Sequence, residues 1–399
     1  MIVIRIIFIL CILIALVILL INNVLAKKNN NKPMKKLENH NFCILIPARD
    51  ESNVIEDLLL SIKNQSYNIG MKNVYVIVED PEDKTILICK KYGSNVVLRK
   101  DLTLRRKGYA LNDAVEEILK SKKKYTAYFI FDADNILDKD FIKNMIPIFD
   151  QGYDIAAGYR NTKNGNDSVV AASSSLTFSL INTIFNNKKV KETRNITFSG
   201  TGFYIRGNII EQLGGFIFHE LTEDYEISMY ATLNNYTTYY NEKSVFYDEQ
   251  PTKYKDTINQ RQRWIRGYFD VRKKYIKEIK KSIIKEDKNY GSKIDAIVGV
   301  IPYIFIITGC FIYLISLIIN MFINKKVLEL IIFMFLIYIV LQIITFILII
   351  AEGNKINLSF KTKVKTLFYN PIFIISFIPC ALKALIKKEV TWNKVKHGN

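Results

Sequence analysis

The sequence is poor in the residues that form zinc sites or disulfide frameworks. It has only three histidines, which lie far apart, and this argues against a zinc site of the usual ligand type. Its five cysteines include no close pair, and such an odd, unpaired set is typical of reduced thiols facing a cytosol. Internal repeats are absent, and low-complexity composition is confined to a Lys/Asn-rich stretch at 27–39. A disulfide framework is therefore excluded.

Acidic residues are scarce relative to basic ones. The 399 residues include 56 Lys and Arg against 38 Asp and Glu, which leaves a formal net charge of +18. This excess favours a partner with phosphates: nucleic acid, an anionic membrane face or a phosphorylated substrate. With 49% hydrophobic and 24% charged residues, the chain is neither wholly disordered nor embedded in a membrane throughout. Its length predicts about two to three structural units.

A long apolar run lies at the N-terminus. Residues 2–22 are almost continuously aliphatic, with Arg5 the only charge, and about 20 such residues suffice to cross a bilayer. The alternative is a cleaved secretory signal with a processing site at 24–26. Five lysines follow the run, so the positive-inside rule places that flank in the cytoplasm. We predict a transmembrane anchor over 1–26, followed by a basic linker over 27–39.

Two more long apolar runs occur late, at roughly 297–323 and 327–351, separated by three polar residues. They predict a hairpin of two membrane-spanning helices over 294–351, with lysine-rich flanks on the cytoplasmic side. The alternative is two buried helices of a soluble domain.

The last apolar patch, 371–386, is short, contains Pro379 and Lys383, and has lysines on both sides. These features are more typical of an interfacial or re-entrant helix than of a span. We therefore assign 352–399 to interfacial or re-entrant helices and a basic cytosolic tail.

Between the apolar runs, residues 40–290 alternate expected strands with helical segments. Buried strands are expected at 42–46, 74–78 and 128–131, and polar or acidic residues follow each of them. This alternation predicts an α/β fold with a mainly parallel sheet, whose ligands bind beyond the carboxyl ends of the strands. Strand-end carboxylates in solvated turns would give much the same pattern.

Asp132 and Asp134 follow directly after one of these strands. Side chains two residues apart in extended chain point to the same face, so both carboxylates can contact one divalent cation. Hard oxygen ligands favour Mg²⁺ or Mn²⁺, which usually also bind a substrate diphosphate. The pair predicts a metal site.

A second cluster, Thr222-Glu223-Asp224, precedes an expected helix. Thr222 could simply cap that helix, because acidic residues are favoured in a first turn. Alternatively, a carboxylate placed across from the metal could remove a proton from a hydroxyl nucleophile.

The third cluster is Gln260-Arg-Gln-Arg263-Trp264. In a helix, Gln260, Arg263 and Trp264 share one face. The arginine could grip a phosphate and the indole could stack on a sugar ring. The alternative is a basic amphipathic helix on anionic lipid.

Taken together, these clusters resemble a known family. In chain order the motifs are Pro47-Ala-Arg-Asp-Glu51, Glu79-Asp80, Lys107-Gly108, Asp132-Ala-Asp134, Gly200-Thr-Gly202, Thr222-Glu-Asp224 and Gln260-x-x-Arg263-Trp264. Their order and spacing are similar to those of membrane-integrated family 2 glycosyltransferases, which include the processive synthases of cellulose, hyaluronan, chitin and poly-N-acetylglucosamine. The resemblance covers about 40–270 and the hydrophobic hairpin, and it implies a GT-A-like fold and an inverting, metal-dependent hexosyltransferase.

The resemblance also implies a role for each matching residue. On the donor side, Glu51 and the acids Glu79 and Asp80 would contact the uracil and ribose, and Lys107 would lie near the nucleotide. Asp132 would lie close to the ribose and the metal, and Asp134 would be the principal ligand of Mg²⁺ or Mn²⁺. The other side would comprise the loop Gly200-Thr201-Gly202, Asp224 as general base, Arg263 at the diphosphate, Trp264 at the acceptor, and Glu223 and Gln260 as further substrate contacts. Two departures from the family pattern concern the nucleotide more than catalysis: Asp50 replaces the usual Asn, and the Glu79-Asp80 loop is unusual. Which of Glu79 and Asp80 contacts the nucleoside stays open, because this loop aligns in more than one way.

The implied reaction moves a sugar from a UDP-sugar to a growing polysaccharide at the cytoplasmic membrane, in a multi-pass protein whose catalytic domain faces the cytosol. The alternatives are single-step transfer to a lipid acceptor and a catalytically silent nucleotide-binding component of an export assembly. Expected partners are the nucleotide-sugar donor, a glycan or lipid acceptor and membrane lipids, with room for accessory export or synthase subunits. Nucleic acid is not expected, because the excess lysines concentrate beside the apolar runs.

Overall fold

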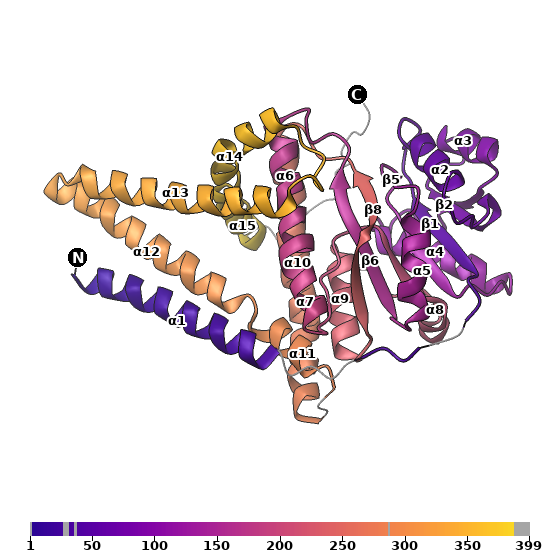
Figure 1. Cartoon of the computed structure of the whole chain (residues 1–399), viewed down its shortest axis with the longest axis horizontal. Helices are drawn as coiled ribbons and strands as arrows, with labels where there is room; N and C mark the ends of the chain where they lie inside the picture. The colour runs from indigo at the N-terminus through magenta and orange to yellow at the C-terminus, as the bar shows by residue number, and fades with distance from the viewer. Residues whose placement is uncertain (1, 27–31, 36–37, 286–287, 387–399) are drawn as a thin grey trace.

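The computed structural model describes residues 2–26, 32–35, 38–285 and 288–386. These residues form a sheet domain and a helical arm that projects from it (Figure 1). The arm consists of α1 (Ile2–Ala26), α12 (Ile301–Asn324) and α13 (Val327–Glu352). All three helices are apolar along most of their length, in agreement with the runs found in the sequence.

An eight-stranded mixed sheet forms the centre of the domain, in the order β3-β2-β1-β4-β7-β6-β8-β5. The strands are β1 (Phe42–Pro47), β2 (Val74–Val78), β3 (Asn95–Leu98), β4 (Ala127–Ile130), β5 (Ile136–Leu137), β6 (Ile155–Thr162), β7 (Phe203–Arg206) and β8 (Thr238–Asp248). The neighbours β3, β2, β1 and β4 are parallel, as are β6 and β8, whereas β5 and β7 run against their neighbours. The predicted fold class, an α/β sheet flanked by helices, is confirmed.

Helices cover both faces of this sheet (Figure 1). They include α2 (Ile55–Lys63), α3 (Thr85–Tyr92), α4 (Lys107–Lys120), α5 (Phe141–Asp150), α8 (Gly207–Leu213) and α9 (Glu223–Leu233). Side chains alternate along β1 because the strand period is two. Cys43 and Leu45 join one core with α4, whereas Phe42, Ile44 and Ile46 join a second core with α2 and α5. With both faces covered, the carboxyl edge of the parallel strands remains available for a site.

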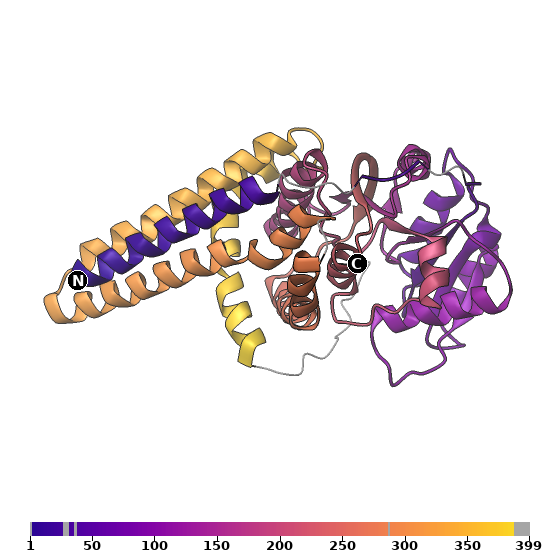
Figure 2. The ribbon, with the colours of Figure 1, turned by 90° about the horizontal axis from the view of Figure 1, so that it is seen from below.

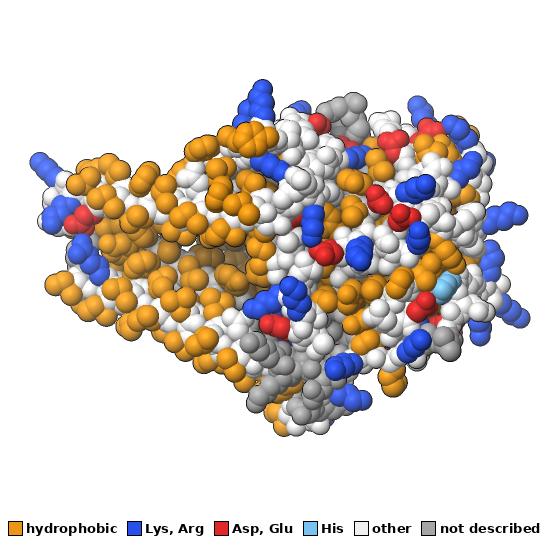
Figure 3. Space-filling model, viewed as in Figure 1, with side chains coloured by type: hydrophobic (Ala, Val, Ile, Leu, Met, Phe, Trp, Pro, Cys, Tyr) orange, Lys and Arg blue, Asp and Glu red, His pale blue; other side chains and the backbone are white. Residues whose placement is uncertain are grey.

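The arm carries a continuous apolar surface. In Figures 1 and 2 α1 and α12 lie side by side, and α13 meets them near the tip, where Arg5 pairs with Glu329. Figure 3 shows hydrophobic side chains over the length of the arm and charged side chains at its tip. Most large side chains of α12 and α13 are exposed, among them Phe311, Phe322, Phe335 and Phe346. Such exposure does not support the alternative of two buried helices, because a soluble domain would cover this area.

Five helical segments within the described residues are long and apolar enough to cross a membrane: Ile2–Leu25, Val169–Lys191, Tyr290–Asn324, Val327–Glu352 and Phe360–Ile386. The second of these comprises α6 (Val169–Ser179), a π-helical turn η2 (Leu180–Asn186) and α7 (Asn187–Lys191). It is mostly buried within the structure, unlike the three helices of the arm.

Further helices join the arm to the sheet domain. They are α10 (Tyr254–Lys285), α11 (Tyr290–Val298), α14 (Phe360–Ile375) and α15 (Phe377–Ile386). The helix predicted at 371–386 covers the end of α14 and all of α15. It is not one continuous helix, because it is interrupted at Ser376. Its interfacial placement stays a prediction.

Candidate active site

A cavity of about 420 Å³ lies at the carboxyl edge of the parallel strands. Eleven of the predicted site residues line it: Glu51, Glu79, Lys107, Asp132, Asp134, Gly200, Glu223, Asp224, Gln260, Arg263 and Trp264. Three others, Asp80, Thr201 and Gly202, are not part of its wall. The edge of the sheet thus gathers the three clusters that lie far apart in the sequence.

A hydrogen-bond network holds the two aspartates that follow β4. The backbone N–H of Asp132 donates to Thr201 Oγ1 at 2.8 Å and to Asn135 Oδ1 at 3.1 Å. Asn135 Nδ2 donates to Asp134 Oδ1 at 3.2 Å and to Asp248 Oδ1 at 3.3 Å. Thr201 therefore lies behind the cavity wall, where it supports the turn that carries the aspartates.

The two glycines of the predicted loop have different surroundings. Gly200 lines the cavity with φ of 91°, and its carbonyl accepts a hydrogen bond from Lys107 Nζ at 2.7 Å. Gly202, with φ of 72°, packs on Phe246 so closely that a Cβ would lie 2.1 Å from that ring. Gly202 thus belongs to the packing under the site, and Gly200 to the site itself.

The residues at Asp134 fit a divalent cation. Burial raises the pKa of Asp134, and the charges of Asp248 and Asp132 raise it further. A cation would relieve this repulsion, because hard carboxylate oxygens favour Mg²⁺ or Mn²⁺ as ligands. No group of three or more His, Cys, Asp or Glu side chains is arranged for a metal in the part of the chain that the structure describes. A cation held by Asp132 and Asp134 would therefore keep positions open for a substrate diphosphate and water.

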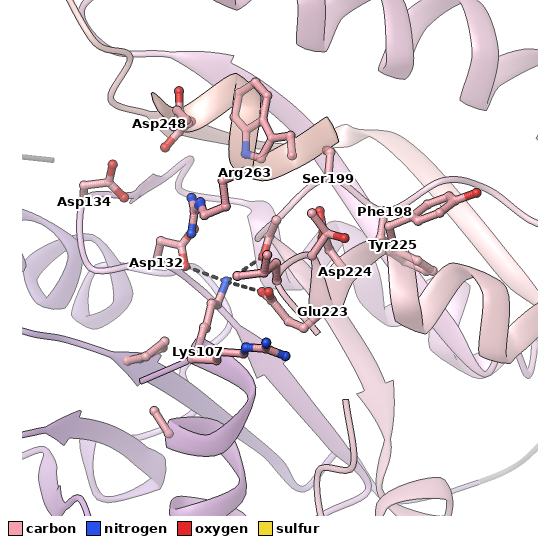
Figure 4. Close-up of a pocket in the computed structure, with 18 of the residues that line it drawn as sticks. Lys107, Asp132, Asp134, Phe198, Ser199, Glu223, Asp224, Tyr225, Asp248 and Arg263 are labelled. Carbon is pink, nitrogen blue, oxygen red and sulfur yellow. Dashed lines mark hydrogen bonds and ion pairs between the residues drawn. The ribbon is translucent and has the colours of Figure 1, made fainter. Parts of the chain in front are cut away.

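Lys107 connects the first cluster to the second (Figure 4). It is the first residue of α4, and its Nζ lies 2.6 Å from Asp132 Oδ1 and 3.2 Å from Glu223 Oε1. Burial lowers the pKa of Lys107, but Asp132 and Glu223 raise it by more, so the net shift is upward and the amine stays protonated. One ammonium group thus bridges carboxylates that are 91 residues apart in sequence.

Glu223 and Asp224 lie at the start of α9 and face the cavity (Figure 4). Burial raises the pKa of Glu223 to about 7, although Lys107 opposes that shift. Burial also raises the pKa of Asp224. Thr222 occupies the capping position but makes no capping hydrogen bond, and its buried hydroxyl has no partner within the described residues. The cap alternative is therefore not supported.

The third cluster lies on α10, and three of its side chains, Gln260, Arg263 and Trp264, face the cavity. Burial lowers the pKa of Arg263, whereas Glu223, Asp132 and Asp224 raise it. The ring of Trp264 meets Phe178 of α6 edge-on, with centroids 5.5 Å apart. The cavity therefore has one charged wall, made by strand ends and helix starts, and one aromatic wall, made by α6 and α10.

The sequence left open which of Glu79 and Asp80 belongs to the site. Glu79 lines the cavity and pairs with Arg49 at 3.0 Å and with Arg99 at 3.8 Å. Asp80 instead accepts a hydrogen bond from the backbone N–H of Glu82 at 2.8 Å, within its own turn. This geometry favours Glu79.

Several charged residues of the cavity were missed from the sequence, among them Arg160 near the end of β6 and Asp248 at the end of β8. These two residues form an ion pair, and Arg160 also donates to the carbonyl of Ser199 at 2.5 Å. The Arg160 guanidinium lies over the Phe178 ring, 3.7 Å from its centroid. Asp248 carries a signal similar to that of Asp132 and Asp134, a carboxylate at the carboxyl end of a strand, and that signal could have identified it.

The family whose sequence model matches this chain is described as "Glycosyltransferase like family 2", and the match runs over residues 40–267. It covers more than half of the chain and every predicted site residue.

Two curated proteins are similar over part of the chain. The probable glycosyltransferase YdaM of Bacillus subtilis (strain 168) is 24% identical over 263 residues, which are 61% of this chain and 58% of that protein. A UDP-forming cellulose synthase of Dictyostelium discoideum is 24% identical over 154 residues, 38% of this chain and 14% of that protein. The chain thus spans less than two thirds of either relative.

A solved structure of the mannosyltransferase PcManGT from Pyrobaculum calidifontis, in complex with GDP-Man and Mn²⁺, has a similar fold. The TM-score is 0.56 at 15% sequence identity, and the match covers 97% of this chain and 100% of the other. The predicted GT-A-like fold is thereby confirmed.

Proposed function

The chain belongs to glycosyltransferase family 2, as its motifs led us to expect, and from this membership we propose that it transfers a hexosyl unit from a UDP-sugar to a growing polysaccharide. The transfer would be a single in-line displacement at the anomeric carbon, with inversion. The observation that carries this proposal is the bridge made by Lys107, because it brings the Asp132 cluster and the Glu223-Asp224 pair to one cavity.

The donor would occupy the charged wall. Asp132 and Asp134 would hold Mg²⁺ or Mn²⁺, which when bound neutralises the charge that builds up on a departing diphosphate. Glu51 and Glu79 would contact the nucleoside, and Lys107 and Arg263 would contact the phosphates, because both cations line the cavity. Arg263 can do so bidentately.

Asp224 would take the proton from the acceptor hydroxyl. A base works best when its pKa lies near the operating pH, and burial moves the pKa of Asp224 in that direction. Glu223 forms an ion pair with Lys107. We therefore assign the role of base to Asp224, the other carboxylate of this pair.

The acceptor would lie against the aromatic wall, where Trp264 and Phe178 offer ring faces and edges for a sugar. The apolar arm supports an acceptor at a membrane, and we propose that the sheet domain faces the cytosol, where nucleotide sugars are made. A second candidate is transfer of one sugar to a lipid, which the apolar residues Phe178 and Ile181 of the same wall favour.

The test incubates membranes that contain the protein with radiolabelled UDP-sugars and sizes the product. A polymer supports the first candidate, whereas a single sugar on a lipid supports the second. UDP release by the Asp224→Asn protein is measured in parallel, and we expect a loss of about 10²–10⁴-fold with donor binding retained. Turnover near wild type would remove Asp224 from the role of base.

A further inference from the structure

The Gln260–Trp264 motif has a second arginine, Arg261, which points away from the cavity. Successive residues of an α-helix are about 100° apart, so Arg261 and Arg263 lie on nearly opposite sides of α10. Arg263 lines the cavity, whereas Arg261 does not and is only 1% exposed. A charged side chain with this degree of burial needs a specific partner.

Arg261 contacts the junction between α14 and α15. Its Nη1 donates to Ser376 Oγ at 2.7 Å and to the Phe373 carbonyl at 3.4 Å. The guanidinium also lies 4.5 Å from the centroid of the Phe373 ring and 4.6 Å from that of Phe377. Its other hydrogen bonds go to Thr257, one turn earlier on α10. The side chain therefore joins α10 to the point where the C-terminal helices break.

The positive charge of Arg261 lies at the C-terminal end of helix α14. Within residues 38–285 and 288–386, its hydrogen bonds go to hydroxyl and carbonyl oxygens, and none goes to a carboxylate. Phe373 lies in the last turn of α14, where carbonyl groups lack N–H partners within the helix and the helix dipole is negative. Its carbonyl also accepts a hydrogen bond from Ser376 Oγ at 2.5 Å. A guanidinium satisfies these carbonyls with fixed geometry, which a lysine amine cannot reproduce.

The same helices brace both sides of the aromatic wall. α15 packs against α10, which carries Trp264, and α14 packs against α6, which carries Phe178. The distance between Trp264 and Phe178 thus depends on where the α14–α15 junction holds α10. Arg261 is the buried charged link at that junction.

We propose that Arg261 is a positioning residue for the acceptor: it fixes α10 on the α14–α15 junction and thereby sets the spacing of Trp264 and Phe178. The proposal rests on the proposed function in placing the acceptor at this wall. It predicts that loss of Arg261 alters acceptor use far more than donor chemistry. Of the donor contacts only Arg263 lies on α10, whereas Lys107 and Asp132 are held by contacts within the sheet domain.

The test compares Arg261→Met and Arg261→Lys with a matched control on the same helix. Arg266→Met is that control, since Arg266 pairs with Asp270 at 2.9 Å one turn apart and lies outside the cavity. For Arg261→Met we expect the apparent KM for the acceptor to rise about 10- to 100-fold, the loss typical of a misplaced binding group, with donor hydrolysis in the absence of acceptor within about twofold of wild type. Arg261→Lys is expected to rescue little, and Arg266→Met to change neither value.

A readout independent of activity separates this proposal from the proposed function. The chain has two tryptophans, so Trp392→Phe leaves Trp264 as the single fluorophore. Arg261→Met in that background is expected to shift the emission of Trp264 to longer wavelength, and this shift would persist even if the chain transferred no sugar. Ser376→Ala removes the 2.7 Å hydrogen bond from Arg261 and the hydrogen bond that Ser376 Oγ donates to the Phe373 carbonyl. It should show the same pattern more weakly and serves if Arg261→Met does not fold. Unchanged emission and unchanged acceptor KM, or parallel losses of donor hydrolysis and transfer, would overturn the proposal.

Discussion

The two halves of the sheet domain build the cavity in different ways. In the N-terminal half, 42–150, the site residues lie at strand ends or at the start of α4, and the sheet itself fixes them. In the C-terminal half, from 155 onward, they lie largely on α9 and α10, and helices from the end of the chain brace them. The charged wall is therefore held mainly by contacts within the sheet domain, whereas the aromatic wall depends on the packing of α14 and α15.

The supporting contacts differ in the elements that they join. Asn135 donates hydrogen bonds to the adjacent Asp134 and to Asp248, which is 113 residues away but lies on a strand of the same sheet. Arg261 and Ser376 are 115 residues apart, and Tyr159 and Glu352 are 193 residues apart. We expect substitutions in the first half to impair donor chemistry, and those at the distant contacts to impair acceptor use or stability.

The largest effect is expected at the metal site. Asp134→Asn removes a buried carboxylate whose raised pKa reflects burial beside two other acids. We expect both donor hydrolysis and transfer to fall by at least about 10²–10³-fold, because an electrostatic contact to the departing phosphate is lost. Steady-state assays over a range of Mg²⁺ and Mn²⁺ concentrations measure this.

Asp140→Asn is the matched control for that substitution. Asp140 is close in sequence, but it accepts a hydrogen bond from Ser66 at the surface and lies outside the cavity. Its replacement should leave both activities near wild type. If Asp134→Asn reduced transfer but spared donor hydrolysis, the division between a donor half and an acceptor half would be wrong.

A smaller effect, with a defined pH dependence, is expected at Lys107. Its charge lowers the pKa values of Glu223 and Asp224, both of which burial raises. In Lys107→Met these pKa values should rise, so Asp224 ionises only at higher pH and the acid limb of kcat/KM moves to higher pH. The donor KM should rise about 10- to 100-fold, as expected when a hydrogen bond to a charged group is lost.

Lys100→Met tests whether loss of any nearby lysine has this effect. Lys100 pairs with Glu116 at 2.6 Å on the surface, outside the cavity. Its replacement should leave the pH profile unchanged. An acid limb that stayed in place in Lys107→Met would show that Lys107 does not set the protonation of the Glu223-Asp224 pair.

Much of the N-terminal half could be predicted from the sequence, because its signals are local. The strands expected at 42–46, 74–78 and 128–131 appear as β1, β2 and β4. Parallel strands end at one edge, so the acids that follow them had to lie near each other. The pairing of Arg160 with Asp248 could not be predicted in this way, because it requires knowing that β6 and β8 are neighbours.

In the C-terminal half, helical periodicity predicts which side chains share a face but not which distant residues they contact. The spacing of Gln260, Arg263 and Trp264 predicted one shared face, and all three line the cavity. The same spacing puts Arg261 on the other face, but nothing near it in the sequence indicates Ser376 or Phe373. The break between α14 and α15 was likewise not predicted, since one serine within an apolar patch does not by itself mark the end of a helix.

The smallest effect on activity is expected where the arm meets the sheet. Glu352, the last residue of α13, is 1% exposed and accepts a hydrogen bond from the Tyr159 hydroxyl at 2.5 Å. Tyr159 precedes Arg160 on β6, so its side chain faces away from the cavity while Arg160 faces into it. Glu352→Gln weakens this link and should lower the free energy of unfolding by about 1–3 kcal/mol, because a buried polar pair loses its charge-assisted bond. Transfer should fall only a few-fold, since Arg160 keeps Asp248 and Ser199 as partners.

Glu242→Gln is the control for this substitution. Glu242 pairs with Lys355 at 2.6 Å near the same joint, but its side chain is 44% exposed, so we expect no measurable loss of stability there. Thermal unfolding in detergent and product formation in membranes measure the two quantities. A large loss of donor hydrolysis in Glu352→Gln would mean that the arm also controls the charged wall, and the two walls would then have to be regarded as one unit.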